Sequence, residues 1–260
     1  MHIFFGDETN KSSSDGEFFV YGGLILSDAQ IVWVHDRVRG YREHYGLGVE
    51  DKIKFTGHAM PDHLDKEHWR ELKSGILDIL VECDATFMAY YVHHDIIKNQ
   101  TQQIRNQWAI EPILYRYQMY LTESESHGFA ILDNIEEAEL RRLEITRINT
   151  EGLKFEPDGD PVPLDRIVGI ARAHVDWSHC LSANDVVLGA FGYSINHPGH
   201  EVANDMMRRV NRMFWHDEMD GVRYMGERGL IRRPKGNIEV AEIRERYQRI
   251  EEHLDRLLNV

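Results

Sequence analysis

Aspartate residues follow apolar runs at three separate places in the chain. Asp7 follows the run IFFG, Asp133 ends the stretch GFAILD, and Asp176 follows a third run, RIVGIARAHV. Each run has the length and composition of a buried strand. An ionised carboxylate is costly to bury without a cation or hydrogen-bond donors. For Asp7 and its neighbour Glu8, the pattern is therefore typical of either a solvated turn or a binding site.

A fourth aspartate, Asp185, lies within the mostly apolar stretch SANDVVLGAFGYSI, which we expect to be a helix. A charge among such neighbours needs a partner. One interpretation is a salt bridge or a favourable position near the helix N-terminus, since Ser182 or Asn184 could cap the helix. The other is that Asp185 belongs to the same site as the strand-end aspartates.

Ligand sites in open α/β sheets collect beyond the carboxyl ends of the strands. If the strands that hold Asp7 and Asp133 are parallel neighbours, their carboxylates meet at one edge. Carboxylates in such proximity repel one another unless they take up protons or share a cation. Mg²⁺ and Mn²⁺ prefer oxygen ligands, and two such ions about 3.5–4 Å apart support phosphodiester cleavage. The pattern therefore predicts metal-dependent phosphodiester chemistry.

The elements that must position these acids follow from the apolar periodicity. Two strands come first, and strands and helices then alternate. We expect strands over 3–7, 17–26, 52–55, 84–93, 128–133 and 166–175, and helices from 29, from 62 or 65 to 82, and over 99–122, 135–149, 182–195, 201–217 and 238–258. This order predicts an α/β domain with a mixed central sheet flanked by helices. We expect residues 1–197 to form that domain and residues 198–260 to add a helical extension packed on it.

Four stretches carry a resemblance to a known family. They are DETN at 7–10, FFVYGGLIL at 18–26, ILD at 131–133 and VDWSHCLSANDVVLGAF at 175–191. In this order they resemble the domain of unknown function 3800, a bacterial and phage family that is similar to ribonuclease H-like nucleases. The resemblance covers residues 1–196 and implies a ribonuclease H-like mixed sheet.

The chain also departs from the family pattern. Asn10 stands where the family has glycine, Trp177 and Ser178 replace a Ser-Lys pair, and Ala183-Asn184 stands where Leu-Ala is usual. The missing lysine after Asp176 weakens the assignment of that residue most.

Carried over by position, the resemblance gives a set of candidate catalytic residues: Asp7, Glu8, Asp133, Asp176, Asp185 and Lys54. Asp7, Asp133 and Asp185 would bind Mg²⁺ or Mn²⁺. Glu8 or Asp176 would complete the metal shell or orient water, and Lys54 would contact phosphate.

Two functions are consistent with these residues. The first is a metal-dependent nuclease or phosphodiesterase that acts on nucleic acid, in phage defence or in a mobile element. The alternative is a non-catalytic binding or scaffold protein of the same fold, with the acids held by arginines. An analogy of fold alone does not decide between them.

The net charge of −14 over 260 residues argues against a protein that coats nucleic acid without sequence preference. Basic residues do gather between 208 and 235, where they could face phosphates or form a solvated surface. Two cysteines cannot form a disulfide framework or a four-cysteine zinc site. With no membrane-spanning apolar run and no signal peptide at the start, the composition predicts a cytoplasmic protein.

Two further patterns have more ordinary explanations. The fifteen histidines include no HExxH motif, so surface or core positions are favoured over a metal site, even for His93-His94-Asp95 and His174, Asp176 and His179. The last expected helix carries an apolar stripe about two heptads long. That stripe could pair with a second copy in a homodimer, or pack on the core of its own chain.

Overall fold

A computed structural model of the chain describes residues 1–133, 135–149, 152–154, 159–174 and 178–258. Its strands are β1 (His2–Thr9), β2 (Phe18–Ser27), β3 (Thr86–His93), β4 (Gly128–Asp133), β5 (Ile167–Ala173), β6 (Asp217–Met219), β7 (Val222–Tyr224) and β8 (Leu230–Arg233). Its α-helices are α1 (Asp28–His44), α2 (Lys66–Glu82), α3 (His94–Ile97), α4 (Gln102–Glu123), α5 (Glu137–Ile148), α6 (His179–Asn196), α7 (Glu201–Met213) and α8 (Ala241–Leu258).

The expected α/β architecture with a mixed central sheet is confirmed. Six strands form one sheet in the order β5-β4-β1-β2-β3-β8. Among them β2 runs antiparallel to its neighbours β1 and β3, whereas β1, β4 and β5 are mutually parallel and β8 is parallel to β3. The carboxyl ends of β1 and β4 therefore lie at the same edge of the sheet.

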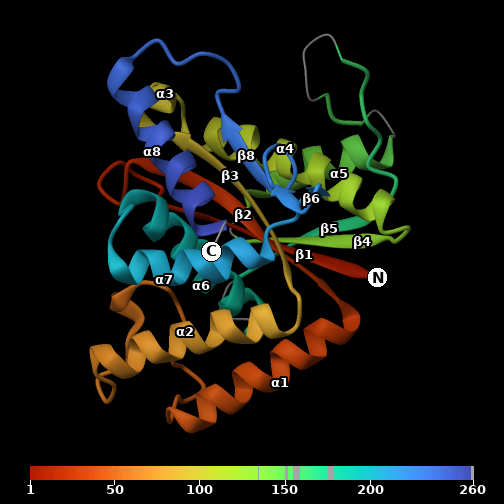
Figure 1. The fold of residues 1–260 in the computed structure, drawn as a ribbon. Coiled ribbons are helices and arrows are strands. Elements are labelled where there is room, and N and C mark those ends of the chain that lie inside the picture. The colour runs from red at the N-terminus through yellow and green to blue at the C-terminus, as the bar shows by residue number, and fades with distance from the viewer. Residues whose placement is uncertain (134, 150–151, 155–158, 175–177, 259–260) are drawn as a thin grey trace.

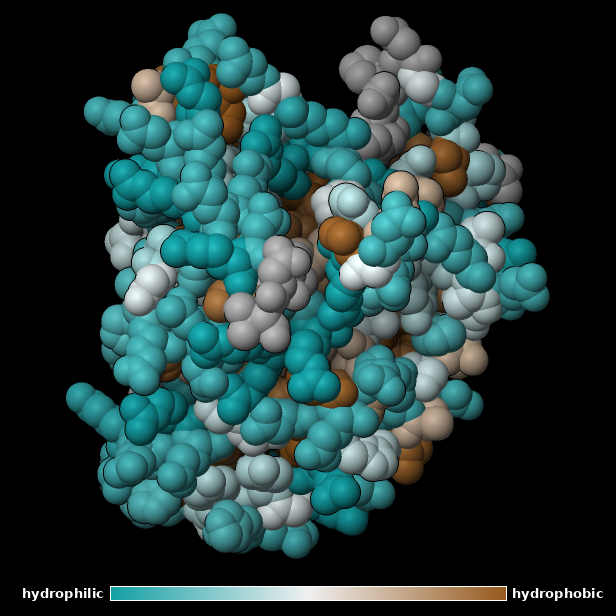
Figure 2. Space-filling model, in the orientation of Figure 1, coloured by the Kyte–Doolittle hydropathy of each residue, from teal (hydrophilic) through white to brown (hydrophobic). Residues whose placement is uncertain are grey.

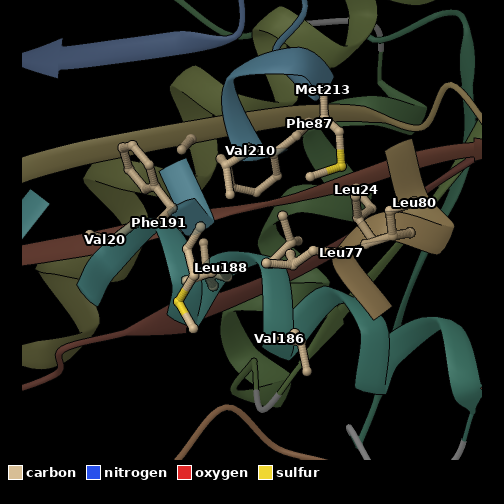
Figure 3. Packing of buried hydrophobic residues seen from close by; sticks show 14 of the residues in the cluster. Val20, Leu24, Leu77, Leu80, Phe87, Val186, Leu188, Phe191, Val210 and Met213 are labelled. Carbon is tan, nitrogen blue, oxygen red and sulfur yellow. The ribbon is translucent and has the colours of Figure 1, made fainter. Parts of the chain in front are cut away.

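Helices cover both faces of the sheet (Figure 1). On one face α6 packs directly on β1 and β2, and α2, α1 and α7 pack around α6. On the other face α4 packs on β2 and β3, and α5 packs on β5. Figure 3 shows the core of the first layer, where Leu24 of β2, Leu77 of α2, Phe87 of β3 and Phe191 of α6 meet.

Local signals in the sequence set where the helices begin. Ser27 caps α1 and forms a capping box with Gln30, and the Asp65 side chain accepts the first free N–H groups of α2. Ser178 caps α6 by accepting the N–H of Leu181. Helix α6 therefore begins three residues before the expected start at residue 182. This shift bears on the role of Asp185.

Two expectations about the elements are wrong. Residues 52–55 form no strand, although Ile53 is buried in the core that also contains residues of α2, α6 and α7. The segment between α7 and α8, where no strand is expected from the sequence, contains the hairpin β6–β7 and the strand β8, which extends the sheet beside β3. Local pattern could not give β8, because its pairing partner lies about 140 residues earlier in the chain.

The apolar stripe of the last helix is buried in the chain's own core. Ile243, Tyr247, Ile250 and Leu254 of α8 all join the same core as α6 and α7. A homodimer through this helix stays a prediction, and these side chains would have to leave the core to form it. On the face seen in Figure 2 the surface is mostly hydrophilic, with small, separate hydrophobic patches. None of the described helices is long and apolar enough to cross a membrane.

Candidate functional site

A cleft of about 810 Å³ opens where β1 and β4 end and α6 and α2 approach them. Its walls include five of the six candidate residues from the sequence: Asp7, Glu8, Lys54, Asp133 and Asp185. The sixth, Asp176, lies outside the described residues. Segments far apart in the chain are thus brought to one place.

Asp7 and Asp133 occupy matched positions on neighbouring parallel strands. The last paired residues of β1 and β4 are Gly6 and Leu132, and the two aspartates follow them directly. Side chains alternate along a strand, so Asp7 lies on the same face as Phe5, and Asp133 on the same face as Ile131. Both of these apolar residues pack in the core beneath α6. The two carboxylates therefore face the helix that carries Asp185.

Asp185 lies in the seventh position of α6, beyond the first turn. The influence of a helix N-terminus falls off within that turn, so it does not account for the charge. Its Oδ2 atom accepts the backbone N–H of Phe55 at 2.7 Å. Phe55 belongs to the segment 52–55 of the expected strand. Asp185 thus holds this segment against the cleft.

The acids act on one another electrostatically. Asp7 is 7% exposed, and burial together with the charges of Glu8, Asp133 and Asp185 raises its pKa well above the usual value of an aspartate. The hydrogen bond from the Glu8 N–H to Asp7 Oδ1, at 2.7 Å, opposes this shift only in part. A carboxyl group under this much repulsion indicates a site that favours a positive ligand.

Glu8 lies on the other side of β1, where it is in register with Tyr21 of β2. Lys11 forms an ion pair with it at 2.7 Å, and the Glu8 side chain is only 6% exposed. The hydroxyl of Tyr21 is fully buried and makes no hydrogen bond to the described residues. Glu8 therefore has a lysine partner of its own, on the opposite side of β1 from Asp7.

The cleft also holds residues outside the set of six candidates. Arg70 and Lys73 of α2, and Tyr193 of α6 and His197 at its end, line it together with Lys54. Lys73 donates from Nζ to the carbonyl oxygen of Phe55 at 3.1 Å, and burial lowers the pKa of this lysine. The spacing along α6 was a usable signal, because residues at i, i+4, i+7, i+8 and i+11 share a helix face. From Asp185, these positions are Gly189, Gly192, Tyr193 and Asn196.

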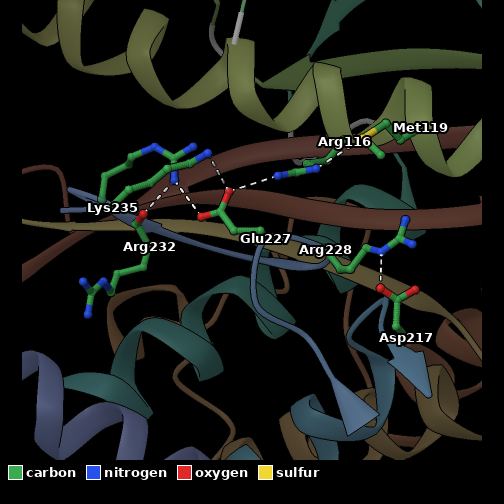
Figure 4. Close-up of polar contacts among 8 residues, drawn as sticks. Arg116, Met119, Asp217, Glu227, Arg228, Arg232 and Lys235 are labelled. Carbon is green, nitrogen blue, oxygen red and sulfur yellow. Dashed lines mark hydrogen bonds and ion pairs between the residues drawn. The ribbon is translucent and has the colours of Figure 1, made fainter. Parts of the chain in front are cut away.

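The basic run near the carboxyl terminus is mostly engaged within the molecule. Figure 4 shows Glu227 beside Arg116 and Lys235, and Arg228 paired with Asp217. Arg233 also forms an ion pair with Glu227. Arg228 also pairs with Glu123, and Arg209 pairs with Asp78 and Asp205. These ion pairs favour the interpretation of the run as a structural surface over a phosphate-binding one.

The donor set suits a hard cation, although it is not arranged around one. Within the described ranges, no group of three or more His, Cys, Asp and Glu side chains is placed so that it could hold a metal ion. Part of the reason is visible at Asp185, whose Oδ2 atom is taken by the Phe55 N–H. The chemistry of the donors nevertheless fits Mg²⁺ or Mn²⁺, since all three aspartates offer oxygen ligands in one cleft.

The histidine groups do not assemble a separate metal site in the described part of the chain. His174 lies with Nδ1 4.0 Å from Oδ1 of Asp133, at the border of the acidic cleft. The ring of His179 instead lies against His35, with centroids 4.6 Å apart.

A comparison with models of known protein families finds none that matches this chain. No curated protein sequence matches it either.

Proposed function

We propose that the chain is a divalent-metal-dependent nuclease or phosphodiesterase with a ribonuclease H-like core, as its resemblance to the domain of unknown function 3800 implies. One observation carries the proposal. Asp7, Asp133 and Asp185, from two strands and a helix, line one cleft, where burial and the charges of Glu8, Asp133 and Asp185 raise the pKa of Asp7. The mixed sheet, with parallel β1 and β4 at its centre, supports the same proposal.

The residues of the cleft would have different roles in the reaction. Asp7, Asp133 and Asp185 would hold Mg²⁺ or Mn²⁺. Such an ion, when bound, activates water and stabilises the charge on the leaving oxygen of a phosphodiester. Lys54 and Lys73 place positive charge in the same cleft, where they would bind and orient a phosphate. Glu8, paired with Lys11, fixes the end of β1 that presents Asp7.

One contact supports the alternative function, that of a non-catalytic binding or scaffold protein. The hydrogen bond from Phe55 to Asp185 gives that acid a structural role without any metal. A non-catalytic binding or scaffold protein of the same fold would use Asp185 in this way. Under this alternative, Mg²⁺ or Mn²⁺ neither binds in the cleft nor stabilises the fold, since a specific ligand stabilises the state that it binds.

The direct test is a cleavage assay with single- and double-stranded DNA and RNA in Mn²⁺. The variants Asp7→Asn and Asp133→Asn should lower the rate on the order of 100-fold, the effect typical of losing one electrostatic contributor to a transition state. Asp36→Asn is the matched control, because Asp36 is exposed on α1, lies outside the cleft and forms an ion pair with nearby Arg39. Equal cleavage by wild type and both cleft variants would reject the proposed roles.

A further inference from the structure

Three rings, those of Phe55, Tyr193 and His197, form a row along the side of the cleft that α6 provides. The rings of Phe55 and Tyr193 lie with centroids 6.1 Å apart at an angle of 47°. Tyr193 then stacks on His197, with centroids 4.4 Å apart and an angle of 27°. His197 is exposed and Tyr193 is half-buried, and all three residues line the cleft. The row therefore begins beside Asp185 and ends at solvent.

A glycine in α6 makes room for the first ring of this row. A Cβ atom at Gly189 would overlap the side chain of Phe55, so only glycine lets Phe55 lie this close to α6. The other side of the segment is fixed by α2, where the Lys73 ammonium lies 4.7 Å from the centroid of the Phe55 ring. Asp185 and Lys73 bind the N–H and the carbonyl of Phe55 respectively. The first ring of the row is thus held from both sides.

Three cations line the same cleft as the row of rings. Among the residues that the structure describes, no carboxylate lies within ion-pair distance of Lys54, Arg70 or Lys73. This sets them apart from Arg209 and Arg228, which each pair with two carboxylates. Unpaired cations beside aromatic faces are the combination that binds the phosphates and bases of single-stranded nucleic acid.

We propose that this cleft binds single-stranded nucleic acid, with bases stacked on Tyr193 and His197 and the backbone phosphates beside Lys54, Arg70 and Lys73. The inference rests on the proposed function for the reaction carried out on that strand. Base pairs in a duplex are stacked on one another, so their faces reach a side-chain ring only after unstacking. Stacking also tolerates every base, because each base has a π-face.

The overall charge sets a limit on the binding mode. With a net charge of −14, the molecule repels nucleic acid everywhere except where cations gather. Three phosphate contacts by Lys54, Arg70 and Lys73 predict a dependence of log affinity on log salt with a slope of about −2, since each contact on a single strand contributes about −0.7. A protein that binds through a broad basic surface gives a much steeper slope.

The test measures binding of the full chain to a short labelled oligothymidylate, and to a labelled duplex of equal length, by fluorescence anisotropy in Ca²⁺. Wild type should bind the single strand more tightly than the duplex. Tyr193→Leu should weaken that binding about 5- to 150-fold, the range for losing one stacked base. Tyr193→Phe should retain it, and the exposed His197→Ala should weaken it without a change in thermal stability. Tyr224→Leu is the matched control, because Tyr224 is an exposed tyrosine of β7 outside the cleft.

Failure of this inference is distinct from failure of the proposed function. Equal or tighter duplex binding, no binding of either form, or wild-type affinity in both Tyr193→Leu and His197→Ala overturns the inference, whatever the cleavage assay gives. Loss of binding in these two variants, in a protein that neither cleaves nor responds to Mn²⁺, upholds the single-strand site and rejects the nuclease.

Discussion

The carboxylate of Asp185 accepts the backbone N–H of Phe55 at 2.7 Å across 130 positions of the sequence. Because Lys73 binds the carbonyl oxygen of the same residue, the segment around Phe55 is held by helices α6 and α2 at once. One of the three aspartates proposed to bind a cation therefore also fixes one wall of the cleft. Asp185 thus has a structural role, the hydrogen bond to Phe55, and a proposed chemical role, metal binding. Substitutions of Asp185 can separate the two.

Asp185→Ala should lower the free energy of unfolding by about 1–3 kcal/mol, because it leaves the Phe55 N–H without its partner. It should also speed amide hydrogen exchange at Phe55 and its neighbours. Asp185→Asn keeps an oxygen that can accept the bond, so most of the stability should return while metal binding does not. Equal stability of the alanine variant and wild type would mean that this bond does not hold the segment.

Asp7→Asn should make the metal-free protein more stable at neutral pH. The pKa of Asp7 is raised in the folded state, so ionisation of this group favours the unfolded chain. That penalty is absent well below the ordinary pKa of 3.8, grows as the pH rises past it, and is complete above the folded-state pKa. Urea unfolding across this pH range should give curves that meet in acid and separate toward pH 7. The exposed control Asp36→Asn should follow wild type, and a less stable Asp7→Asn at neutral pH would contradict the argument.

Much of this architecture follows from local pattern. The strand over 128–133 and a helix start at residue 62 or 65 follow from the sequence because apolar runs and capping residues act over a few positions, and the structure places the cap at Asp65. The pairing of β1 with β4 was expected only conditionally, and the structure supplies it. The strand β8 was missed because four residues, LIRR, show no alternation of their own. Arg70 and Lys73 could not be found from the sequence because only tertiary packing brings α2 to the cleft, whereas Tyr193 could have been found from its spacing to Asp185 along α6.

The helical glycines Gly189 and Gly40 should respond in opposite ways to alanine. Gly40→Ala in α1 meets no atom within 4 Å and should stabilise the chain by up to about 1 kcal/mol through helix propensity. Gly189→Ala forces Phe55 away from α6 and should cost about 1–3 kcal/mol, as overpacking does. It should also weaken oligothymidylate binding. A stabilising Gly189→Ala with unchanged binding would show that the close approach of Phe55 has no role in the cleft.

Buried histidines should make the protein sensitive to mild acid. Burial lowers the pKa of His93, His94 and His253, so the folded state holds them neutral. Their contribution to stability is present above the ordinary value of 6.5 and is lost as the pH falls from there toward the folded-state pKa values. The Nε2 atom of His253 has no hydrogen-bond partner among the described residues, so His253→Leu should reduce this acid sensitivity. Exposed His200→Gln is the control, and an unchanged pH profile for His253→Leu would refute the assignment.

The central claim is that Asp7, Asp133 and Asp185 together bind a hard divalent cation. Calorimetric titration of the metal-free protein with Mn²⁺, paired with thermal unfolding, tests it most directly. The account predicts a saturable heat and a rise in Tm of about 5–10 °C at a hundredfold excess over Kd, both strongly reduced in Asp7→Asn and Asp133→Asn and retained in Asp36→Asn. No heat and no stabilisation at millimolar Mn²⁺, or equal affinity in wild type and both cleft variants, would contradict it.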